Sequence, residues 1–190
     1  MSRFISVVTP TLQRESLIHC CAAVNAQSFT DWHHVVVVDC DNFNLPMMAK
    51  IAHPQRTIIK CGHPHKNFGN TCRNTGWKYT DSEWVSYCDD DNFYAHADVF
   101  AELNEALRDV EYWAIAPIFR HGQVFFHDPP GCCYVDTANM IIRREIAQWP
   151  NRDEYTLDGI FCDELKAQYP YKAFPNMNPI VVMPHSNEGK

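Results

Sequence analysis

The sequence of 190 residues contains no long apolar run and no polybasic stretch. A helix that spans a bilayer needs about 18 or more consecutive apolar residues, and no segment approaches that length. The first residues enter an apolar, strand-like segment directly, without the longer apolar stretch and small-residue cleavage site of a signal peptide. No amphipathic basic helix favours docking on a membrane surface. We therefore expect a soluble, cytoplasmic protein without a membrane partner.

Positive charge is also scarce. Lys and Arg number 16 against 23 Asp and Glu, which gives a formal net charge of −7. Duplex nucleic acids bind proteins chiefly through Lys- and Arg-rich faces, because these side chains neutralise the phosphates. The charge balance therefore disfavours a nucleic-acid partner, although a local basic patch can still occur on an acidic protein.

The nine cysteines include no Cys-x-x-Cys pair. They are scattered through apolar segments, which predicts reduced, buried thiols rather than a disulfide framework. The segment Cys61-Gly62-His63-Pro64-His65 raises the question of a structural zinc ion. Its ligands are crowded at alternate positions, however, and no second pair follows at the usual spacing of such sites.

Repeats, low-complexity stretches and Gly/Ser linkers are absent, which predicts a single domain over residues 1–190. Apolar, β-branched runs predict strands at residues 4–8, 35–38, 57–61, 84–88 and 113–119. Apolar residues at helical spacing predict helices at residues 15–27, 46–53, 70–79 and 98–110. The pattern after residue 119 is more irregular, with a turn at 121–123, a loop at 128–131, a strand at 135–143, a helix at 158–169 and a last strand at 180–183.

Strands that alternate with helices predict an α/β fold with a mostly parallel central sheet covered on both faces. In such sheets, ligands bind beyond the carboxyl ends of the strands. The residues expected at that edge are Thr9, Thr11, Asp39, Asp89 and Asp91. This convergence predicts a ligand site at one edge of the sheet.

The acidic run Asp89-Asp90-Asp91-Asn92 directly follows a predicted buried strand. Adjacent carboxylates repel one another, so we expect a cation to compensate them. Mg²⁺ and Mn²⁺ take oxygen ligands and are commonly held by one or two carboxylates together with substrate phosphates. The run therefore predicts a divalent metal site, and the alternative is a solvated acidic turn.

Four further polar residues suit either a ligand or a purely structural role. Asp39 follows a run of valines and can accept hydrogen bonds from a base or ribose, or can cap a turn. Gly69 permits a tight loop into a helix whose N-terminus favours an anion, and Arg73 can contact a diphosphate or pair with a carboxylate. Asp158 can act as a general base or cap a helix. His185 can complete a metal shell or simply be exposed.

In their order along the chain, these segments resemble the family 2 glycosyltransferases of the GT-A fold. The matching pieces are Ile5-Ser6-Val7-Val8-Thr9-Pro10-Thr11, Gln27-Ser28-Phe29-Thr30-Asp31-Trp32 leading to Asp39, Asn67-Phe68-Gly69 followed by Arg73-Asn74-Thr75-Gly76, Trp84-Val85-Ser86-Tyr87-Cys88-Asp89-Asp90-Asp91-Asn92 and, more loosely, Asp158-Gly159. Residues 4–100 match well and the rest match weakly. The resemblance implies a Rossmann-like sheet flanked by helices, with a nucleotide-sugar-binding half at about 1–119 and a more irregular acceptor and catalytic half at about 120–190.

The resemblance also implies roles for residues that hold the donor. Thr9 and Thr11 would line the nucleotide pocket, and Asp39 would bond the base of the donor. Asn67 and Arg73 would shape the donor site, with Arg73 near the diphosphate.

Asp89 and Asp91 look like the Asp-x-Asp pair of the family. Asp91 is then the favoured direct ligand of Mn²⁺ or Mg²⁺, and Asp89 is its companion on the donor side. Asp90 is ambiguous, because some members of the family carry their acidic pair on adjacent residues. His185 looks like the C-terminal metal-binding histidine of some GT-A enzymes.

Asp158 is similar to the catalytic base of the family, although Leu157 stands where the family usually has an acidic residue. The resemblance thus implies an inverting, metal-dependent transfer of a sugar from a nucleotide-diphosphate donor, with a UDP-sugar favoured. The acceptor would be a hydroxyl of an unidentified glycan or small molecule.

Two alternatives stay open. One is a nucleotidyltransferase that acts on sugar phosphates, and the other is a non-catalytic module of the same fold that binds a glycan or nucleotide. Nucleotidyltransferases usually carry a Gly-rich, basic loop after the first strand, and the segment Thr9-Pro10-Thr11-Leu12-Gln13-Arg14 has no glycine.

Overall fold

The computed structural model describes residues 3–62, 67–132, 134–150, 152 and 154–184. Its strands are β1 (Arg3–Thr11), β2 (Trp32–Val38), β3 (Arg56–Lys60), β4 (Ser82–Tyr87), β5 (Phe93–Tyr94), β6 (Trp113–Ile115), β7 (Ile118–Arg120), β8 (Gln123–Phe125), β9 (Met140–Arg143), β10 (Tyr171–Ala173) and β11 (Val181–Met183). Its α-helices are α1 (Ser16–Asn25), α2 (Leu45–Ile51), α3 (Asn70–Trp77), α4 (Val99–Ala106) and α5 (Leu157–Gln168), and short 3₁₀ helices cover Thr137–Asn139 and Arg144–Ile146.

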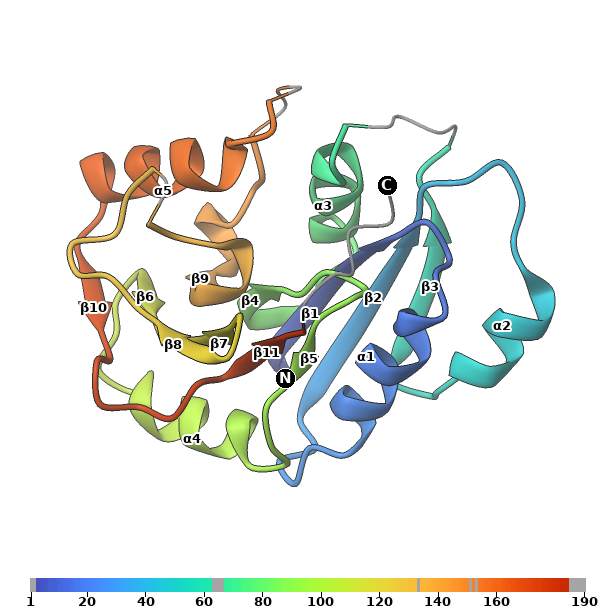
Figure 1. Ribbon diagram of the computed structural model, residues 1–190, viewed down its shortest axis with the longest axis horizontal. Coiled ribbons are helices and arrows are strands. Elements are labelled where there is room, and N and C mark those ends of the chain that lie inside the picture. The colour runs from blue at the N-terminus through green and yellow to red at the C-terminus, as the bar shows by residue number, and fades with distance from the viewer. Residues whose placement is uncertain (1–2, 63–66, 133, 151, 153, 185–190) are drawn as a thin grey trace.

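The strands form two sheets (Figure 1). The larger sheet has the order β10-β6-β9-β4-β1-β2-β3, and the smaller has the order β5-β11-β7-β8. Strands β3, β2, β1 and β4 are parallel neighbours, whereas β9 runs antiparallel between β4 and β6. The predicted α/β class with a mostly parallel central sheet is confirmed.

Helices cover both faces of the larger sheet. Ile5 and Val7 of β1 pack in a core cluster with side chains of α1 and α4. Val8, which points to the opposite face, packs in a second cluster with side chains of α3 and α5. Val36 of β2 is covered by α1 and α2. Because successive side chains of a strand alternate between faces, one continuous apolar run such as that of β2 fills both layers.

The second half departs from prediction where the chain changes sheets. The strand predicted at 113–119 is in fact two strands, β6 in the larger sheet and β7 in the smaller. Pro117 lies between them and has no N–H to donate to a ladder, while its carbonyl accepts a hydrogen bond from the backbone N–H of Ile180 at 2.8 Å. The strand predicted at 135–143 begins only at Met140, because Asp136 caps a 3₁₀ turn by accepting a hydrogen bond from the N–H of Ala138 at 3.1 Å.

The other predictions for this half fare better. The turn at 121–123 is confirmed, since His121 and Gly122 have φ angles of 51° and 78° in the tight hairpin between β7 and β8. Helix α5 and strand β11 lie at the predicted places. Strands β5, β8 and β10 have two or three residues each and are too short to show a period in sequence. Within the described chain, no helix is long and apolar enough to cross a membrane.

Candidate active site

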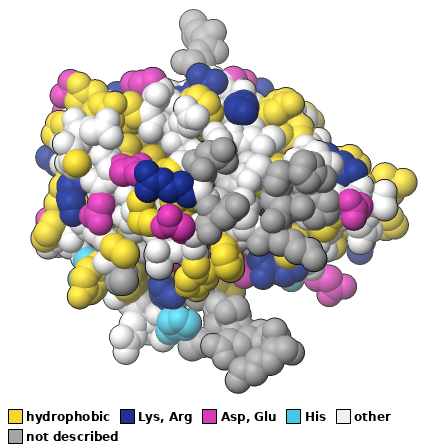
Figure 2. All heavy atoms as spheres, turned by 90° about the horizontal axis from the view of Figure 1, so that it is seen from above, with side chains coloured by type: hydrophobic (Ala, Val, Ile, Leu, Met, Phe, Trp, Pro, Cys, Tyr) yellow, Lys and Arg dark blue, Asp and Glu magenta, His cyan; other side chains and the backbone are white. Residues whose placement is uncertain are grey.

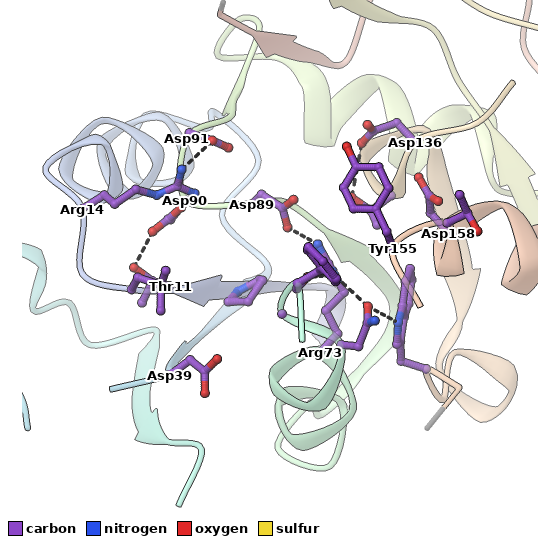
Figure 3. A pocket seen from close by; sticks show the side chains of 18 of the residues that line it. Thr11, Arg14, Asp39, Arg73, Asp89, Asp90, Asp91, Asp136, Tyr155 and Asp158 are labelled. Carbon is purple, nitrogen blue, oxygen red and sulfur yellow. Dashed lines mark hydrogen bonds and ion pairs between the residues drawn. The ribbon is translucent and has the colours of Figure 1, made fainter. Parts of the chain in front are cut away.

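A cavity of about 770 Å³ lies at the carboxyl edge of the parallel strands. Both halves of the chain line it: one wall comes from the segments after β1, β2 and β4 and from the start of α3, and the facing wall comes from residues 135–137 and the start of α5 (Figure 3). Cavities of about 300–1,000 Å³ suit small-molecule ligands. Seen from above, acidic, basic and hydrophobic side chains lie close together on the surface (Figure 2). The position confirms that the carboxyl edge of the sheet carries a cavity.

Asp90, the middle carboxylate of the acidic run, is held in place by Arg14 and Thr11. Asp90 is 1% exposed, accepts a hydrogen bond from the Thr11 hydroxyl at 2.5 Å and forms an ion pair with Arg14. Arg14 also donates to Asp91 at 2.9 Å. Burial raises the pKa of Asp90, while the hydrogen bonds from Arg14 and Thr11 act in the opposite direction. Arg14 therefore supplies part of the positive charge that the acidic run requires.

Arg73 projects from α3 and is almost fully buried. It pairs with Asp89 at 2.5 Å and donates to the backbone carbonyl of Phe68 at 2.8 Å. Its guanidinium carbon lies 5.1 Å from the centre of a ring of Trp149. Among the described residues, the buried Nε–H of Arg73 has no hydrogen-bond acceptor. The guanidinium is thus fixed in place beside the cavity by its bonds to Asp89, Phe68 and Asn70.

Asn70, at the start of α3, joins the two walls of the cavity. Its carbonyl oxygen accepts hydrogen bonds from Trp149 Nε1 at 3.1 Å and from Arg73 at 3.3 Å. Its amide nitrogen donates to the backbone carbonyls of Arg152 at 3.3 Å and Glu154 at 3.1 Å. One buried side chain therefore holds the segment before α5 against the first turn of α3.

Two carboxylates face the acidic run from the opposite wall. Asp158, in the first turn of α5, accepts a hydrogen bond from the N–H of Gly159 at 2.8 Å. Asp136 accepts one from the N–H of Ala138, and its other oxygen lies 4.0 Å from Arg120. Burial raises the pKa of both carboxyls, and the negative charge of Asp89 raises both further. A carboxylate with a raised pKa is suited to accept a proton near neutral pH.

The structure brings most of the predicted site residues to the cavity. Thr11, Asp39, Arg73, Asp158 and all three carboxylates of the acidic run line it. Asp39 is 5% exposed, and its backbone N–H donates to the carbonyl of Thr11 at 2.9 Å, which ties the ends of β1 and β2 together.

Two predicted residues lie outside the cavity lining. Thr9 is fully buried under α1, and its hydroxyl bonds His34 Nε2 at 2.9 Å. Asn67 bonds the hydroxyl of Thr71 at 2.6 Å and thereby shapes the loop before α3 rather than the wall itself. His185 lies outside the described residues, so its metal-binding role stays a prediction.

Several cavity residues were not found from sequence. Arg14 and Asp136 contribute charge, and Arg120, Trp149 and Tyr155 complete the wall that faces the acidic run. A signal existed for Arg14, because adjacent carboxylates at a strand end require a cation and Arg14 follows the neighbouring strand. Asp136 stood inside a segment predicted as strand, where its side chain had no evident role.

A family model described as glycosyl transferase family 2 matches residues 6–162. Among solved structures, S. aureus TarS residues 1–349 is similar with a TM-score of 0.76 at 14% identity, over 94% of this chain and 60% of that one. The same protein in complex with UDP-GlcNAc gives a TM-score of 0.73 at 15% identity, over 94% and 58% of the two chains. No curated protein matches.

A further solved structure is the mannosyltransferase PcManGT from Pyrobaculum calidifontis in complex with GDP-Man and Mn²⁺. It gives a TM-score of 0.73 at 16% identity, over 100% of this chain and 59% of that one. The chain therefore spans about three fifths of the length of these structures, and the likeness shows the fold, which is the GT-A type with its mostly parallel sheet.

Proposed function

The chain belongs to glycosyl transferase family 2, and from that premise we propose that it transfers a sugar from a nucleotide-diphosphate donor to an acceptor hydroxyl, with inversion and with Mn²⁺ or Mg²⁺. A UDP-sugar is the favoured donor, and the acceptor is a glycan or small molecule. The observation that carries this proposal is the arrangement of three charged side chains around one cavity. Arg73, fixed by its ion pair, and Asp89, a carboxylate that can bind a metal ion, lie on one wall, and Asp158, whose pKa is raised, lies on the facing wall.

The donor lies, in this proposal, along the wall formed by residues 1–119. Asp39 and Thr11 contact the base and ribose at the ends of β1 and β2. Arg73 lines the cavity and contacts the diphosphate, because a planar guanidinium fixed by its neighbours binds phosphate oxygens without losing further freedom. Asn67 acts indirectly by holding the loop that carries Gly69 and Asn70.

The residues present fit a divalent metal ion. Asp89 and Asp91 each have 32% of the side chain exposed, and their ion pairs with Arg73 and Arg14 engage one oxygen of each carboxylate. Oxygen ligands of this kind are those that Mg²⁺ and Mn²⁺ prefer. When bound, the metal supplies positive charge that stabilises the leaving diphosphate. Asp90 is committed to Arg14 and Thr11 and orients the two carboxylates beside it.

The acceptor lies against the wall formed by residues 120–190. Asp158 accepts the proton of the attacking hydroxyl, and general-base catalysis of this kind is worth about 10²–10⁴-fold. Its raised pKa, caused first by burial, supports that role. Asp136 and Arg120 offer an acceptor and a donor of hydrogen bonds to sugar hydroxyls beside the reacting centre.

A thermal-shift screen of UDP, GDP, CDP and their sugars, each with and without Mn²⁺, tests the proposal. We expect one nucleoside diphosphate to raise the melting temperature, and only when the metal is present. At a ligand concentration of 100 times Kd, binding stabilises the folded state by roughly 2.7 kcal/mol. In Asp91→Ala we expect this stabilisation and all metal-dependent turnover to be lost. Equal stabilisation and turnover in wild type and Asp91→Ala would contradict the proposed metal role.

Product analysis separates the two alternatives. Pyrophosphate release from a nucleoside triphosphate and a sugar phosphate would identify a nucleotidyltransferase. Metal-dependent donor binding without transfer to any acceptor or hydrolysis of the donor would identify a binding module. Release of a nucleoside diphosphate together with an inverted glycoside supports the glycosyltransferase.

A further inference from the structure

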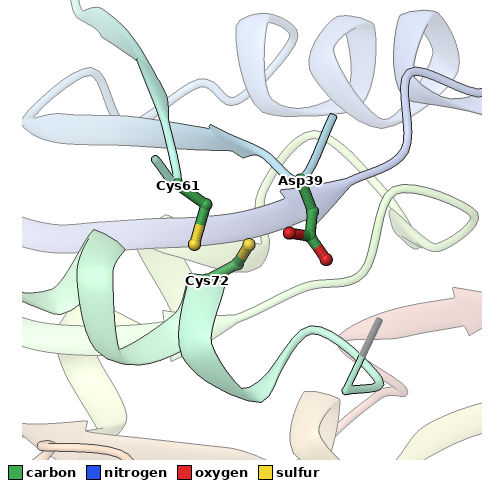
Figure 4. A group of neighbouring side chains, drawn as sticks. All are labelled: Asp39, Cys61 and Cys72. Atoms are coloured by element: carbon green, nitrogen blue, oxygen red, sulfur yellow. The ribbon is translucent and has the colours of Figure 1, made fainter. Parts of the chain in front are cut away.

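Behind the cavity wall, Asp39 lies beside two buried thiols. Cys61 directly follows β3 and is 9% exposed, and Cys72 lies in α3 and is fully buried. One ligand atom from each of Asp39, Cys61 and Cys72 lies within 4.8 Å of the other two. The sulfur atoms of Cys61 and Cys72 point toward each other, with the carboxylate of Asp39 beside Cys72 (Figure 4).

We propose that Asp39, Cys61 and Cys72 form a binding site for a thiophilic divalent cation of the Zn²⁺ class. Cysteine sulfur and carboxylate oxygen are both zinc ligands, and three protein ligands with one open position are the pattern of accessible rather than closed zinc sites. Asp39 lines the cavity, from which water would reach the fourth position. The site differs from the Asp89 and Asp91 pair, whose all-oxygen ligands suit harder cations.

The surroundings keep the Cys72 thiol protonated when no cation is bound. The neighbouring Cys61 thiol and burial raise the pKa of Cys72 well above its usual range, so without a cation Cys72 stays protonated. Binding of Zn²⁺ displaces one proton from each thiol, since coordinated thiols are deprotonated. The Arg73 guanidinium acts on the pKa of Cys72 in the opposite sense to burial.

A second pair of buried thiols provides the natural comparison. Cys20 and Cys88 are also buried, and a hydrogen bond between them raises the pKa of Cys88, as the one with Cys61 does for Cys72. Among the described residues, no third His, Cys, Asp or Glu ligand atom completes a group with them within the same 4.8 Å. The carboxylate of Asp39 therefore distinguishes the two thiol pairs.

Occupancy of the site has a consequence for the donor, and this consequence rests on the proposed function. Asp39 is the residue proposed to bond the nucleotide base, and a coordinated carboxylate no longer accepts that hydrogen bond. A thiophilic cation at Cys61 and Cys72 thus competes with the donor nucleotide, although the catalytic metal lies elsewhere. The same chain would be activated by Mn²⁺ and inhibited by Zn²⁺.

Titration of the reduced, chelator-treated full chain with Co²⁺ and Zn²⁺ tests the site directly. We expect about one thiophilic cation per chain, with a thiolate-to-cobalt charge-transfer absorption. Cys72→Ser and Asp39→Asn weaken binding by more than about 100-fold, because even residues that only orient a ligand are worth about 10–100-fold. The control Cys20→Ser keeps wild-type binding. Absence of the absorption in wild type, or its persistence in Cys72→Ser and Asp39→Asn, overturns the site.

Binding of UDP with Mn²⁺, measured by calorimetry with and without one equivalent of Zn²⁺, tests the competition. Zn²⁺ is expected to weaken UDP binding at least tenfold in wild type and in Cys20→Ser, but not in Cys72→Ser. Unchanged UDP affinity in wild type despite a bound thiophilic cation overturns the competition. Failure of every nucleoside diphosphate to bind without Zn²⁺ overturns the proposed function instead, and leaves the cation result intact.

Discussion

The two walls of the cavity are built in different ways. The wall with Arg73 and Asp89 stands on long neighbouring elements, since β1 has nine residues, β2 has seven, and both are paired with parallel neighbours. The facing wall with Asp136 and Asp158 stands on strands of three or four residues, 3₁₀ turns and one helix. Its side chains are placed by contacts with distant segments, such as that between Trp149 and Asn70. The comparison predicts that the first wall governs donor binding and stability, and the second governs turnover.

The largest expected effect lies on the second wall. In Asp158→Asn we expect kcat to fall by about 10²–10⁴-fold with an unchanged affinity for the nucleoside diphosphate, because an amide does not accept the proton of the acceptor. Steady-state kinetics and calorimetry measure the two quantities. The control is Asp163→Asn on the same helix, where the carboxylate is exposed and pairs with Lys166. A loss of donor affinity equal to the loss of kcat would contradict the assignment of donor binding and turnover to different walls.

The same residue predicts a pH dependence. Burial raises the pKa of Asp158, so the carboxyl of wild type becomes protonated at a higher pH than an ordinary carboxyl near 3.9. Activity is therefore expected to fall as the pH drops through this raised value, by about tenfold per pH unit below it. A pH profile of kcat/KM between pH 4 and about 8 measures the pH at which activity falls on the acid side. A midpoint at the ordinary carboxyl pKa contradicts the assignment of Asp158 as the base.

On the first wall, Arg73→Lys is expected to weaken donor binding by about 10–100-fold. Lysine lacks the planar fork that reaches Asp89 and the carbonyl of Phe68 together, and a hydrogen bond to a charged group is worth about 1.5–3 kcal/mol. Calorimetry with UDP and Mn²⁺ measures the change. Arg108→Lys in the exposed turn that follows α4 serves as the matched control. Full donor affinity in Arg73→Lys would show that the diphosphate does not need this guanidinium.

Alanine substitutions at Gly76 and Gly131 compare how tightly the two regions are packed. A Cβ at Gly76 would lie 2.5 Å from Val8 Cγ1 and 2.9 Å from Val37 Cγ2, in the packed layer between α3 and the sheet. Gly76→Ala is therefore expected to lower the free energy of unfolding by about 1–3 kcal/mol. A Cβ at Gly131 would meet only the terminal side-chain atoms of Asp163 and Lys166, at 3.2 and 3.5 Å. Gly131→Ala should stay within about 0.5 kcal/mol, as urea denaturation of both variants can measure.

The smallest expected effect is a gain in stability. The folded-state pKa of Asp136 is raised by burial, and the charges of Asp89 and Asp158 add to the shift. Its ionisation in the folded state therefore lowers the free energy of unfolding. This stability is lost as the pH rises from the ordinary carboxyl pKa through the raised pKa of Asp136. Asp136→Asn keeps an acceptor for Ala138 and is expected to raise the melting temperature at pH 7 by about 2–4 °C for about 1 kcal/mol. An unchanged or lower melting temperature at pH 7, with the same variant unchanged at pH 4, would contradict it.

The first region was predictable because its signals are local. Strands β1, β2 and β4 are β-branched or aromatic runs ended by polar residues, and parallel strands bring those ends to one edge. Strand periodicity predicts the face of a side chain but not its depth. Thr9 and Thr11 share one face of β1, yet α1 covers Thr9, and only Thr11 reaches the cavity.

The second region was predictable only where its elements are long. The helix with Asp158 has twelve residues and was found, whereas β6 and β7 were merged because an apolar run does not reveal that Pro117 separates two sheets. Asp136 is placed by its own 3₁₀ turn inside the predicted strand, whereas Trp149 is held by a hydrogen bond to Asn70, which is far away in the sequence. No pattern within a short window records such contacts.

The amide of Asn70 has consequences for how the acceptor side can be exchanged. Its oxygen has two lone pairs and its nitrogen two hydrogens, and four hydrogen bonds use all of them. Aspartate at this position would set a second acceptor against two backbone carbonyls, and serine is too short to span them. The two walls are therefore structurally coupled through Asn70. A segment that replaces the one between Trp149 and α5, in order to change the acceptor, must keep two backbone carbonyls and the indole N–H of Trp149 within hydrogen-bonding distance of Asn70.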